Sequence, residues 1–304
     1  MKVLITGGTG LIGSRLAELL VAAGHEVALL SREPGRGGPY RTFQWDPTAG
    51  TIDPAAVPYA EVIVNLAGAN VGEGRWTDAR KKELLASRLD SLALLGRELA
   101  KPGHRVQVVL SASAIGIYGD TGARLVTEET PLASPTADFL AAVCQQWEQA
   151  AMPIAALGIR LVTPRIGVVL SAKGGALLPL ARTVKLGIGA ALGSGQQYLS
   201  WIHIDDLCHL FIAMLTDDAW QGPYNAVAPY PATNEAFNEV LAEVLHRSLL
   251  LPKVPAFALK LALGEQSGIV LAGQRVSGEK VLARGFEFEY PVLRGALKAL
   301  YGAG

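Results

Sequence analysis

The sequence predicts an α/β fold, with a doubly wound and mostly parallel sheet covered by helices on both faces. Two observations support this prediction. Short runs of apolar residues alternate with segments in which apolar residues recur every three or four positions. A glycine-rich turn, "TGGTGLIG", follows the first apolar run and precedes the first of those segments. The 304 residues suffice for one large domain or up to two ordinary ones.

The alternation begins at the N-terminus. Residues 3–6 form a continuous apolar run typical of a buried strand, and residues 11–23 carry apolar side chains at helical spacing. The run at residues 26–30, "EVALL", is a second buried strand by the same criterion. The chain is therefore expected to open with a βαβ unit.

The same pattern continues to about residue 170. The expected segments are a strand over 61–66, a helix over 77–100, a strand over 105–110, a helix over 139–152 and a strand from 159 to 163. After residue 171 glycines and prolines become frequent and the alternation is lost, which predicts a smaller second lobe. A helix is expected there over 235–247, with Asn234 as its N-cap.

Composition narrows the class of protein. Lysine plus arginine and aspartate plus glutamate both number 27, so no excess charge favours nucleic acid or an anionic membrane as partner. The two cysteines, Cys144 and Cys208, are far apart in the chain, which is typical of a reducing compartment. The apolar runs are too short for a signal peptide or a membrane span. We therefore expect a cytoplasmic protein, either a monomer or a homodimer. We also expect it to hold no metal, because no two histidines have metal-ligand spacing.

The glycine turn predicts a phosphate site. Gly7, Gly10 and Gly13 follow a strand and open a helix, where glycine permits a tight turn, close backbone approach and close helix packing. The helix N-terminus adds partial positive charge. We therefore expect this turn to bind the pyrophosphate of a dinucleotide.

The end of the second strand distinguishes between two dinucleotides. An NAD enzyme usually has a carboxylate here for the ribose 2′-hydroxyl, whereas an arginine accommodates the 2′-phosphate of NADP. This chain has Ser31 and Arg32, a hydroxyl beside a planar guanidinium that can bond two phosphate oxygens. Glu33 would repel a phosphate only if it faced inward, and we expect it to face solvent. The sequence favours NADP(H).

Three further motifs carry a family resemblance. With the glycine turn, "NLAGA" at 65–69, "LSASAIGIYG" at 110–119 and "SWIHIDDL" at 200–207 make the chain similar to the extended short-chain dehydrogenases/reductases. That superfamily includes nucleotide-sugar epimerases and dehydratases. More narrowly, "WDPTAG", "RIGVVLS" and the C-terminal "GEQSGIVLAGQRVSGEK" resemble the NAD-dependent epimerase/dehydratase-like, YfcH-like epimerase-family proteins.

The resemblance implies a particular architecture. It is a Rossmann-type domain formed by residues 1–170 plus about 202–228, with a smaller, discontinuous C-terminal substrate lobe formed by about 171–201 plus 229–304. A small-molecule substrate would bind in the cleft between these two parts.

The resemblance also implies roles for individual residues. The Ser113 hydroxyl lies closest to the superfamily's catalytic serine. By the same resemblance, the cofactor pyrophosphate would be lined by Gly7, Thr9, Gly10, Leu11 and Ile12, and the 2′-phosphate would be held by Ser31 and Arg32. The adenosine and its ribose would lie near Leu66, Ala67 and Gly68, and the nicotinamide near Ser111 and Ala112.

One part of the family pattern is missing. The superfamily uses a tyrosine and a lysine four residues later on one helix face, so that the ammonium lowers the pKa of the phenol and bonds the cofactor ribose. None of the eight tyrosines here has that lysine. Glu148, the acidic residue near the end of the expected helix over 139–152, gives the register of the family's helix. In that register the tyrosine position falls on Leu140 and the lysine position on Cys144.

Two hypotheses therefore stay open. The protein is an NADP(H)-dependent oxidoreductase or epimerase with a different acid, or a non-catalytic NADPH-binding sensor or regulatory protein. Four residues are candidates to replace the missing pair: Tyr118, Glu148, His203 and Arg165. Each also has a structural interpretation, respectively as a packed tyrosine, a solvated helix residue, a hydrogen-bonded histidine and an ion-paired arginine.

Overall fold

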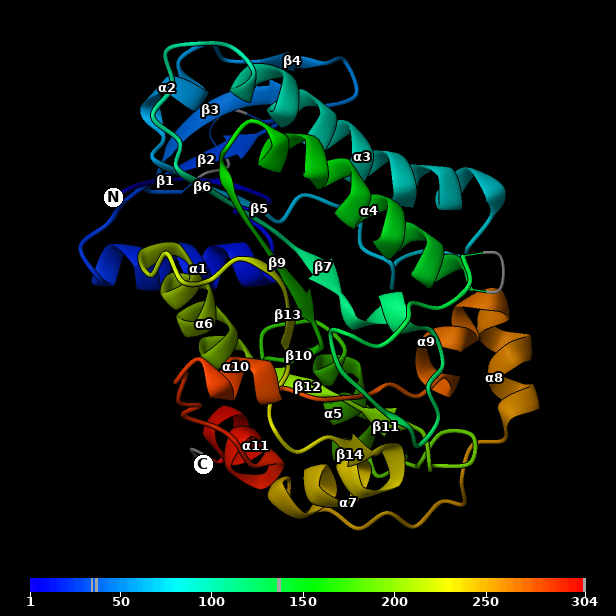
Figure 1. Ribbon diagram of the computed structural model, residues 1–304. Coiled ribbons are helices and arrows are strands. Elements are labelled where there is room, and N and C mark those ends of the chain that lie inside the picture. The colour runs from blue at the N-terminus through cyan, green and yellow to red at the C-terminus, as the bar shows by residue number, and fades with distance from the viewer. Residues whose placement is uncertain (34, 36–37, 136–137, 303–304) are drawn as a thin grey trace.

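The computed structural model describes residues 1–33, 35, 38–135 and 138–302. A large sheet with helices on both sides occupies one part, and a smaller lobe containing α7 and α11 lies beyond one end of the strands (Figure 1). No helix in the described residues is both long enough and apolar enough to span a bilayer.

The central sheet is doubly wound, as the sequence predicts. Its strand order is β13-β9-β6-β5-β1-β2-β3-β4, with β7 also paired to β9, and every pair except β3 with β4 is parallel. The chain order reverses on either side of β1, which opens a crevice at the carboxyl ends of β1 and β5. The strands are β1 (Lys2–Thr6), β2 (Glu26–Ser31), β3 (Arg41–Asp46), β4 (Thr51–Ile52), β5 (Val62–Asn65), β6 (Val108–Ser111), β7 (Ser113–Ala114), β9 (Arg160–Ile166) and β13 (Gly222–Ala226).

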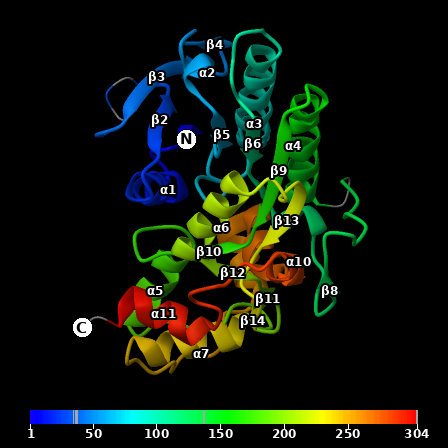
Figure 2. The ribbon, with the colours of Figure 1, turned by 60° about the vertical axis from the view of Figure 1, so that its left-hand side comes forward.

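Helices cover both faces of this sheet, and the strands are apolar on both faces for that reason. Along β1, Val3 and Ile5 belong to the cluster beneath one helix layer, and Leu4 belongs to the opposite cluster. Figure 2 shows α1 on one side of β5 and the packed pair α3 and α4 on the other. The covering helices are α1 (Leu11–Ala22), α6 (Ile204–Thr216), α3 (Asp78–Leu99) and α4 (Phe139–Ala156).

The smaller lobe has its own core. Trp201, Phe237 and Leu297 are buried in it together.

The remaining elements of the whole chain, in chain order, are α2 (Ala56–Tyr59), η1 (Ile115–Tyr118), β8 (Leu125–Val126), β10 (Val168–Leu170), α5 (Leu177–Lys185), β11 (Tyr198–Leu199), β12 (Trp201–His203), β14 (Ala232–Thr233), α7 (Asn234–Val244), α8 (Ala256–Leu263), η2 (Gly264–Ser267), α9 (Gly268–Leu271), β15 (Arg275–Val276), α10 (Glu279–Ala283) and α11 (Leu293–Tyr301).

The structure differs from the sequence prediction at one helix start. The N-cap of α7 is Thr233, whose hydroxyl accepts a hydrogen bond from the Ala236 amide at 3.2 Å. The prediction of Asn234 as the cap is wrong. Asn234 is instead the first residue of the helix, and its Oδ1 accepts from the Leu192 amide at 2.8 Å, a contact that no local pattern encodes.

Arg160 ties the sheet to the C-terminal end of α6. From β9, its Nη1 donates to the carbonyls of Met214 and Trp220 at 2.8 and 2.9 Å, and its Nη2 donates to Leu215 at 3.2 Å. The bonds to Met214 and Leu215 satisfy carbonyls that the end of α6 leaves without intrahelical partners, and they place a cation at the negative end of the helix dipole.

We expect Arg160→Met to lower the free energy of unfolding by about 2 kcal/mol, because buried carbonyls lose charged donors. Urea denaturation followed by circular dichroism measures this change. Arg105→Met, at an exposed arginine, is the control and should leave stability unchanged. Equal stability of the two variants would contradict this role for Arg160.

Candidate functional site

The glycine turn after β1 approaches the end of β5 closely. Gly7 has a φ of +66°, which favours glycine, and a Cβ atom there would lie 2.8 Å from the Leu66 carbonyl oxygen. The Gly10 amide donates to the Gly7 carbonyl at 3.0 Å and closes the turn. Only glycine at position 7 fits both the backbone conformation and the approach to β5.

The third glycine lets α1 begin directly on this turn. A Cβ atom on Gly13 would lie 2.4 Å from the Gly7 carbonyl oxygen. The N-cap residue Gly10 offers no side-chain acceptor, and the first turn of α1 contains no carboxylate. The first amides of the helix are thus left for an external anion, at the positive end of the helix dipole.

A cavity of about 690 Å³, here called the adenosine cavity, extends from this turn along the ends of β2 and β5 to α3. Its walls include most of the residues expected to hold the cofactor's phosphates and adenosine. These are Gly7, Thr9, Gly10, Ser31, Arg32, Leu66, Ala67 and Gly68.

The end of β2 presents a guanidinium to this cavity. Ser31 Oγ donates to the Glu33 carbonyl at 2.9 Å and accepts from the Glu33 amide at 3.2 Å, so its hydroxyl stabilises the turn. Arg32 is exposed and has no hydrogen-bond or ion-pair partner in the described residues. Glu33 is exposed, as expected, yet it also lines the cavity.

The backbone at the end of β5 is held by Thr6. Its hydroxyl donates to Asn65 Oδ1 at 2.7 Å and accepts from the amides of Leu66 and Ala67, both at 3.0 Å. This buried contact joins β1 to the loop after β5. The small residues that follow therefore form a fixed wall of the adenosine cavity.

The residues expected near the nicotinamide lie at the end of β6. Ser111, Ala112 and Ser113 are all buried, and they line neither the adenosine cavity nor the second cavity described below. Ile12 also lines neither one, whereas Leu11 lines the second.

Ser113 belongs to a buried polar network. Its Oγ donates to Glu148 Oε1 at 2.7 Å. Arg165 donates to both oxygens of the same carboxylate, from Nε at 2.8 Å and from Nη2 at 2.9 Å. Burial by itself lowers the pKa of Arg165, but the hydrogen bond and charge of Glu148 outweigh it and raise that pKa above its usual value. The pair is a bidentate salt bridge inside the protein.

Tyr118 lies at the other end of this network. Its hydroxyl accepts from Arg165 Nη1 at 2.8 Å and donates to Asn225 Oδ1 at 2.8 Å. Burial raises the pKa of Tyr118, and the Arg165 charge offsets this only in part. Strand register explains the assembly, because Ser113 on β7 and Asn225 on β13 both pair with Arg165 on β9.

Apolar packing occupies the positions of the missing tyrosine and lysine. A Cβ atom on Gly116 would lie 3.6 Å from Leu140 Cβ and 3.7 Å from Cys144 Sγ. Burial raises the pKa of the Cys144 thiol to about 12, so it is neutral at physiological pH. These two residues of α4 therefore provide neither an acid nor a cation.

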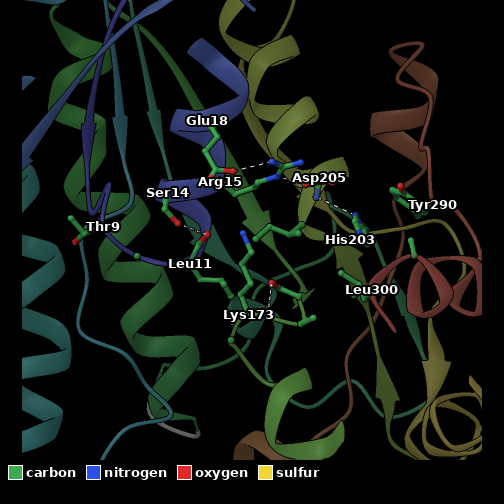
Figure 3. Close-up of a pocket in the computed structure, with 16 residues that line it drawn as sticks. Thr9, Leu11, Ser14, Arg15, Glu18, Lys173, His203, Asp205, Tyr290 and Leu300 are labelled. Atoms are coloured by element: carbon green, nitrogen blue, oxygen red, sulfur yellow. Dashed lines mark hydrogen bonds and ion pairs between the residues drawn. The ribbon is translucent and has the colours of Figure 1, made fainter. Parts of the chain in front are cut away.

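A second cavity, of about 600 Å³, reaches the glycine turn from the side of α1. Figure 3 shows Lys173 extending into it from the loop after β10, below Arg15 and Asp205. Arg15 Nε donates to Asp205 at 2.6 Å and Nη1 to Glu18 at 2.9 Å, so this guanidinium is already neutralised. On its far side, Tyr290 and Leu300 of the smaller lobe close the cavity (Figure 3).

His203 has a structural role at the edge of this cavity. Its Nδ1 accepts from the Asp205 amide at 3.2 Å and caps α6. The ring is only 2 % exposed, and burial lowers its pKa, so it stays neutral with the proton on Nε2. The described residues contain no group of three or more potential metal ligands.

Fold and site together define a dinucleotide-binding α/β protein. The family model described as "NAD dependent epimerase/dehydratase family" matches residues 3–227, and a domain of unknown function, DUF1731, matches residues 254–300. The chain belongs to the NAD dependent epimerase/dehydratase family.

Similarity to known members extends along the whole chain. The epimerase family protein YfhF of Bacillus subtilis is 36% identical over 303 residues, which cover 99% of this chain and 98% of YfhF. The structure of human epimerase family protein SDR39U1 with NADPH matches with a TM-score of 0.89 at 34% identity, over 100% of both chains. A nucleoside-diphosphate sugar epimerase from Corynebacterium glutamicum matches with a TM-score of 0.80 at 31% identity, over 99% of this chain and 58% of that one.

We expect Gly13→Ala to weaken nucleotide binding at least about tenfold, because the added methyl group forces the Gly7 carbonyl and the turn apart. Titration with NADPH, followed by its fluorescence, measures the change. Gly96→Ala in α3 is the matched control, since its Cβ would meet nothing closer than Ile154 Cγ1 at 3.8 Å. A Gly13→Ala variant that binds as tightly as the control would contradict the proposed cradle.

Proposed function

We propose that this protein is an NADP(H)-dependent oxidoreductase or epimerase of the short-chain dehydrogenase/reductase superfamily that acts on a small molecule. A nucleotide-linked sugar is the first substrate class to test. The adenosine cavity is the observation that carries the proposal. It joins an uncapped helix N-terminus, a wall of small residues and the guanidinium of Arg32, which has no partner in the part of the chain that the structure describes.

The residues fit the phosphorylated cofactor. The turn at Gly7, Thr9 and Gly10 provides room for the pyrophosphate, since Gly7 and Gly10 carry no side chain, and the first amides of α1 face it. Arg32 holds the 2′-phosphate, and Ser31 fixes the turn that presents it. When bound, the nicotinamide supplies or accepts a hydride. The structure of the human relative with NADPH supports this choice of cofactor.

The preference for NADPH over NADH tests the cofactor assignment. Arg32→Ala should weaken NADPH binding by about tenfold or more and leave NADH binding within about twofold, because only NADPH carries the 2′-phosphate. Parallel fluorescence titrations measure both affinities. Arg124→Ala, at another exposed arginine, is the control. Equal losses for NADPH and NADH would assign Arg32 a role unrelated to the 2′-phosphate.

We place the reaction at Ser113 and Glu148. In this proposal the Ser113 hydroxyl bonds the reacting oxygen of the substrate, and the Glu148 carboxylate accepts or returns the proton through that hydroxyl. The Glu148 side chain is 18% exposed, so the network reaches solvent at this carboxylate. Arg165 fixes the carboxylate with its two bonds.

Tyr118 was the second catalytic candidate from the sequence. Its hydroxyl is buried and bonded on both sides, so we assign it a positioning role, holding Arg165 against Glu148. The Tyr118 hydroxyl then moves no proton in the reaction.

The test of catalysis is loss of nicotinamide absorbance when the protein and NADPH meet a panel of carbonyl and nucleotide-sugar compounds. Ser113→Ala should abolish turnover, and Glu148→Gln should lower it by about 100-fold, with NADPH affinity nearly unchanged in both. Glu98→Gln, at an α3 residue paired with Lys101, is the control.

Unchanged turnover in Ser113→Ala would remove that residue from the mechanism. NADPH binding by the wild-type protein without oxidation by any compound would instead favour a non-catalytic sensor.

A further inference from the structure

The interior contains a cation that the proposed chemistry does not use. Arg88, on α3, is only 9% exposed. Its Nη1 donates to the Leu84 carbonyl at 2.7 Å and its Nη2 to the Ala69 carbonyl at 3.2 Å. No carboxylate of the described residues forms an ion pair with it. Burying a charge without an opposite charge is costly, so a folding role alone does not explain why an arginine stands here.

Arg88 lies directly behind the wall of the adenosine cavity. A Cβ atom on Gly68, which lines that cavity, would lie 3.1 Å from Arg88 Cζ. Ala69, whose carbonyl Arg88 binds, lines the same cavity. The positive charge is therefore separated from the cavity by a single layer of backbone, with no side chain of Gly68 between them.

The opposite side of Arg88 faces the helix that lacks the expected lysine. Its Cζ lies 4.8 Å from the ring centroid of Trp147 on α4, one turn after Cys144. The family resemblance implies a lysine at position 144, and here the guanidinium reaches the same region from α3. The Cys144 thiol stays neutral because burial raises its pKa to about 12, so it does not cancel the charge.

We propose that Arg88 supplies, from α3, the fixed positive charge that the resemblance places on a lysine at position 144. The inference rests on the proposed function, because the charge acts on the bound NADP(H). Arg88 is a positioning residue: it acts through the backbone of Gly68 and Ala69, holding the Ala69 carbonyl and making the potential at this wall of the adenosine cavity more positive.

An arginine suits this role from α3. Its planar fork bonds two carbonyls at once, and its charge lies over the Trp147 ring, so the guanidinium has a fixed place without a carboxylate partner among the described residues. A small residue at position 144 leaves room for this arrangement. The two features, arginine at 88 and cysteine at 144, belong together in this explanation.

The test compares two ligands in variants of the full chain. NADPH reports on the whole site, and adenosine 2′,5′-bisphosphate reports on the adenosine half alone. Arg88→Met should weaken both ligands about tenfold, because both contain the phosphorylated adenosine half that lies against this wall. Arg88→Lys should keep NADPH affinity within about threefold of wild type.

A second-site variant separates charge from packing. In Arg88→Met, the added change Cys144→Lys returns an ammonium to the position that the resemblance assigns to it, and should restore most of the lost NADPH affinity. A merely structural role for Arg88 would not be rescued in this way. If Arg88→Met does not fold, Arg88→Gln is the neutral variant for the same comparison.

Arg160→Met is the matched control, since Arg160 also binds carbonyls from inside the fold but lies at the end of α6. It should lower the melting temperature without changing either affinity. Unchanged affinity for both ligands in Arg88→Met, or no rescue by the added lysine, would overturn the inference. A wild-type protein that binds neither ligand would instead overturn the proposed function.

Discussion

The cavity depends above all on the close approach of the glycine turn to the end of β5. The Gly7 backbone lies against Leu66 so closely that any side chain would collide, and Gly13 brings α1 onto the same turn. This approach places an uncapped helix N-terminus beside a wall of small residues at the crevice where the strand order reverses. An anion bound there gains helix amides and dipole without any charged side chain at the turn.

Buried charge is arranged in two different ways around this cavity. Glu148 and Arg165 neutralise each other in a bidentate pair, and Ser113 and Tyr118 complete the hydrogen bonds of that pair. Among the described residues, Arg88 has only carbonyl partners and an aromatic ring beside it. A paired charge creates a rigid polar cluster with little external field, whereas an unpaired charge in a medium of low dielectric acts over a longer distance.

The return of the chain from the smaller lobe completes the polar cluster. Strand β13 joins the sheet beside β9 after the excursion through β10, α5, β12 and α6, and this register brings Asn225 next to Arg165. Without this strand the Tyr118 hydroxyl would lose its acceptor. The smaller lobe therefore contributes to the candidate reaction centre indirectly, through the path that the chain takes around it.

The sequence by itself determined the parallel sheet, the glycine turn and Arg32 at the end of β2, because these depend on local periodicity and on residues adjacent in the chain. It did not predict β3, a short strand in which polar residues alternate with the buried Phe43 and Trp45. Only the tertiary structure decided that Ser113, Glu148, Arg165, Tyr118 and Asn225 form one cluster, and that Arg88 lies behind Gly68. The physical reason is that strand register and helix packing set these contacts, and both join residues that are distant in the sequence.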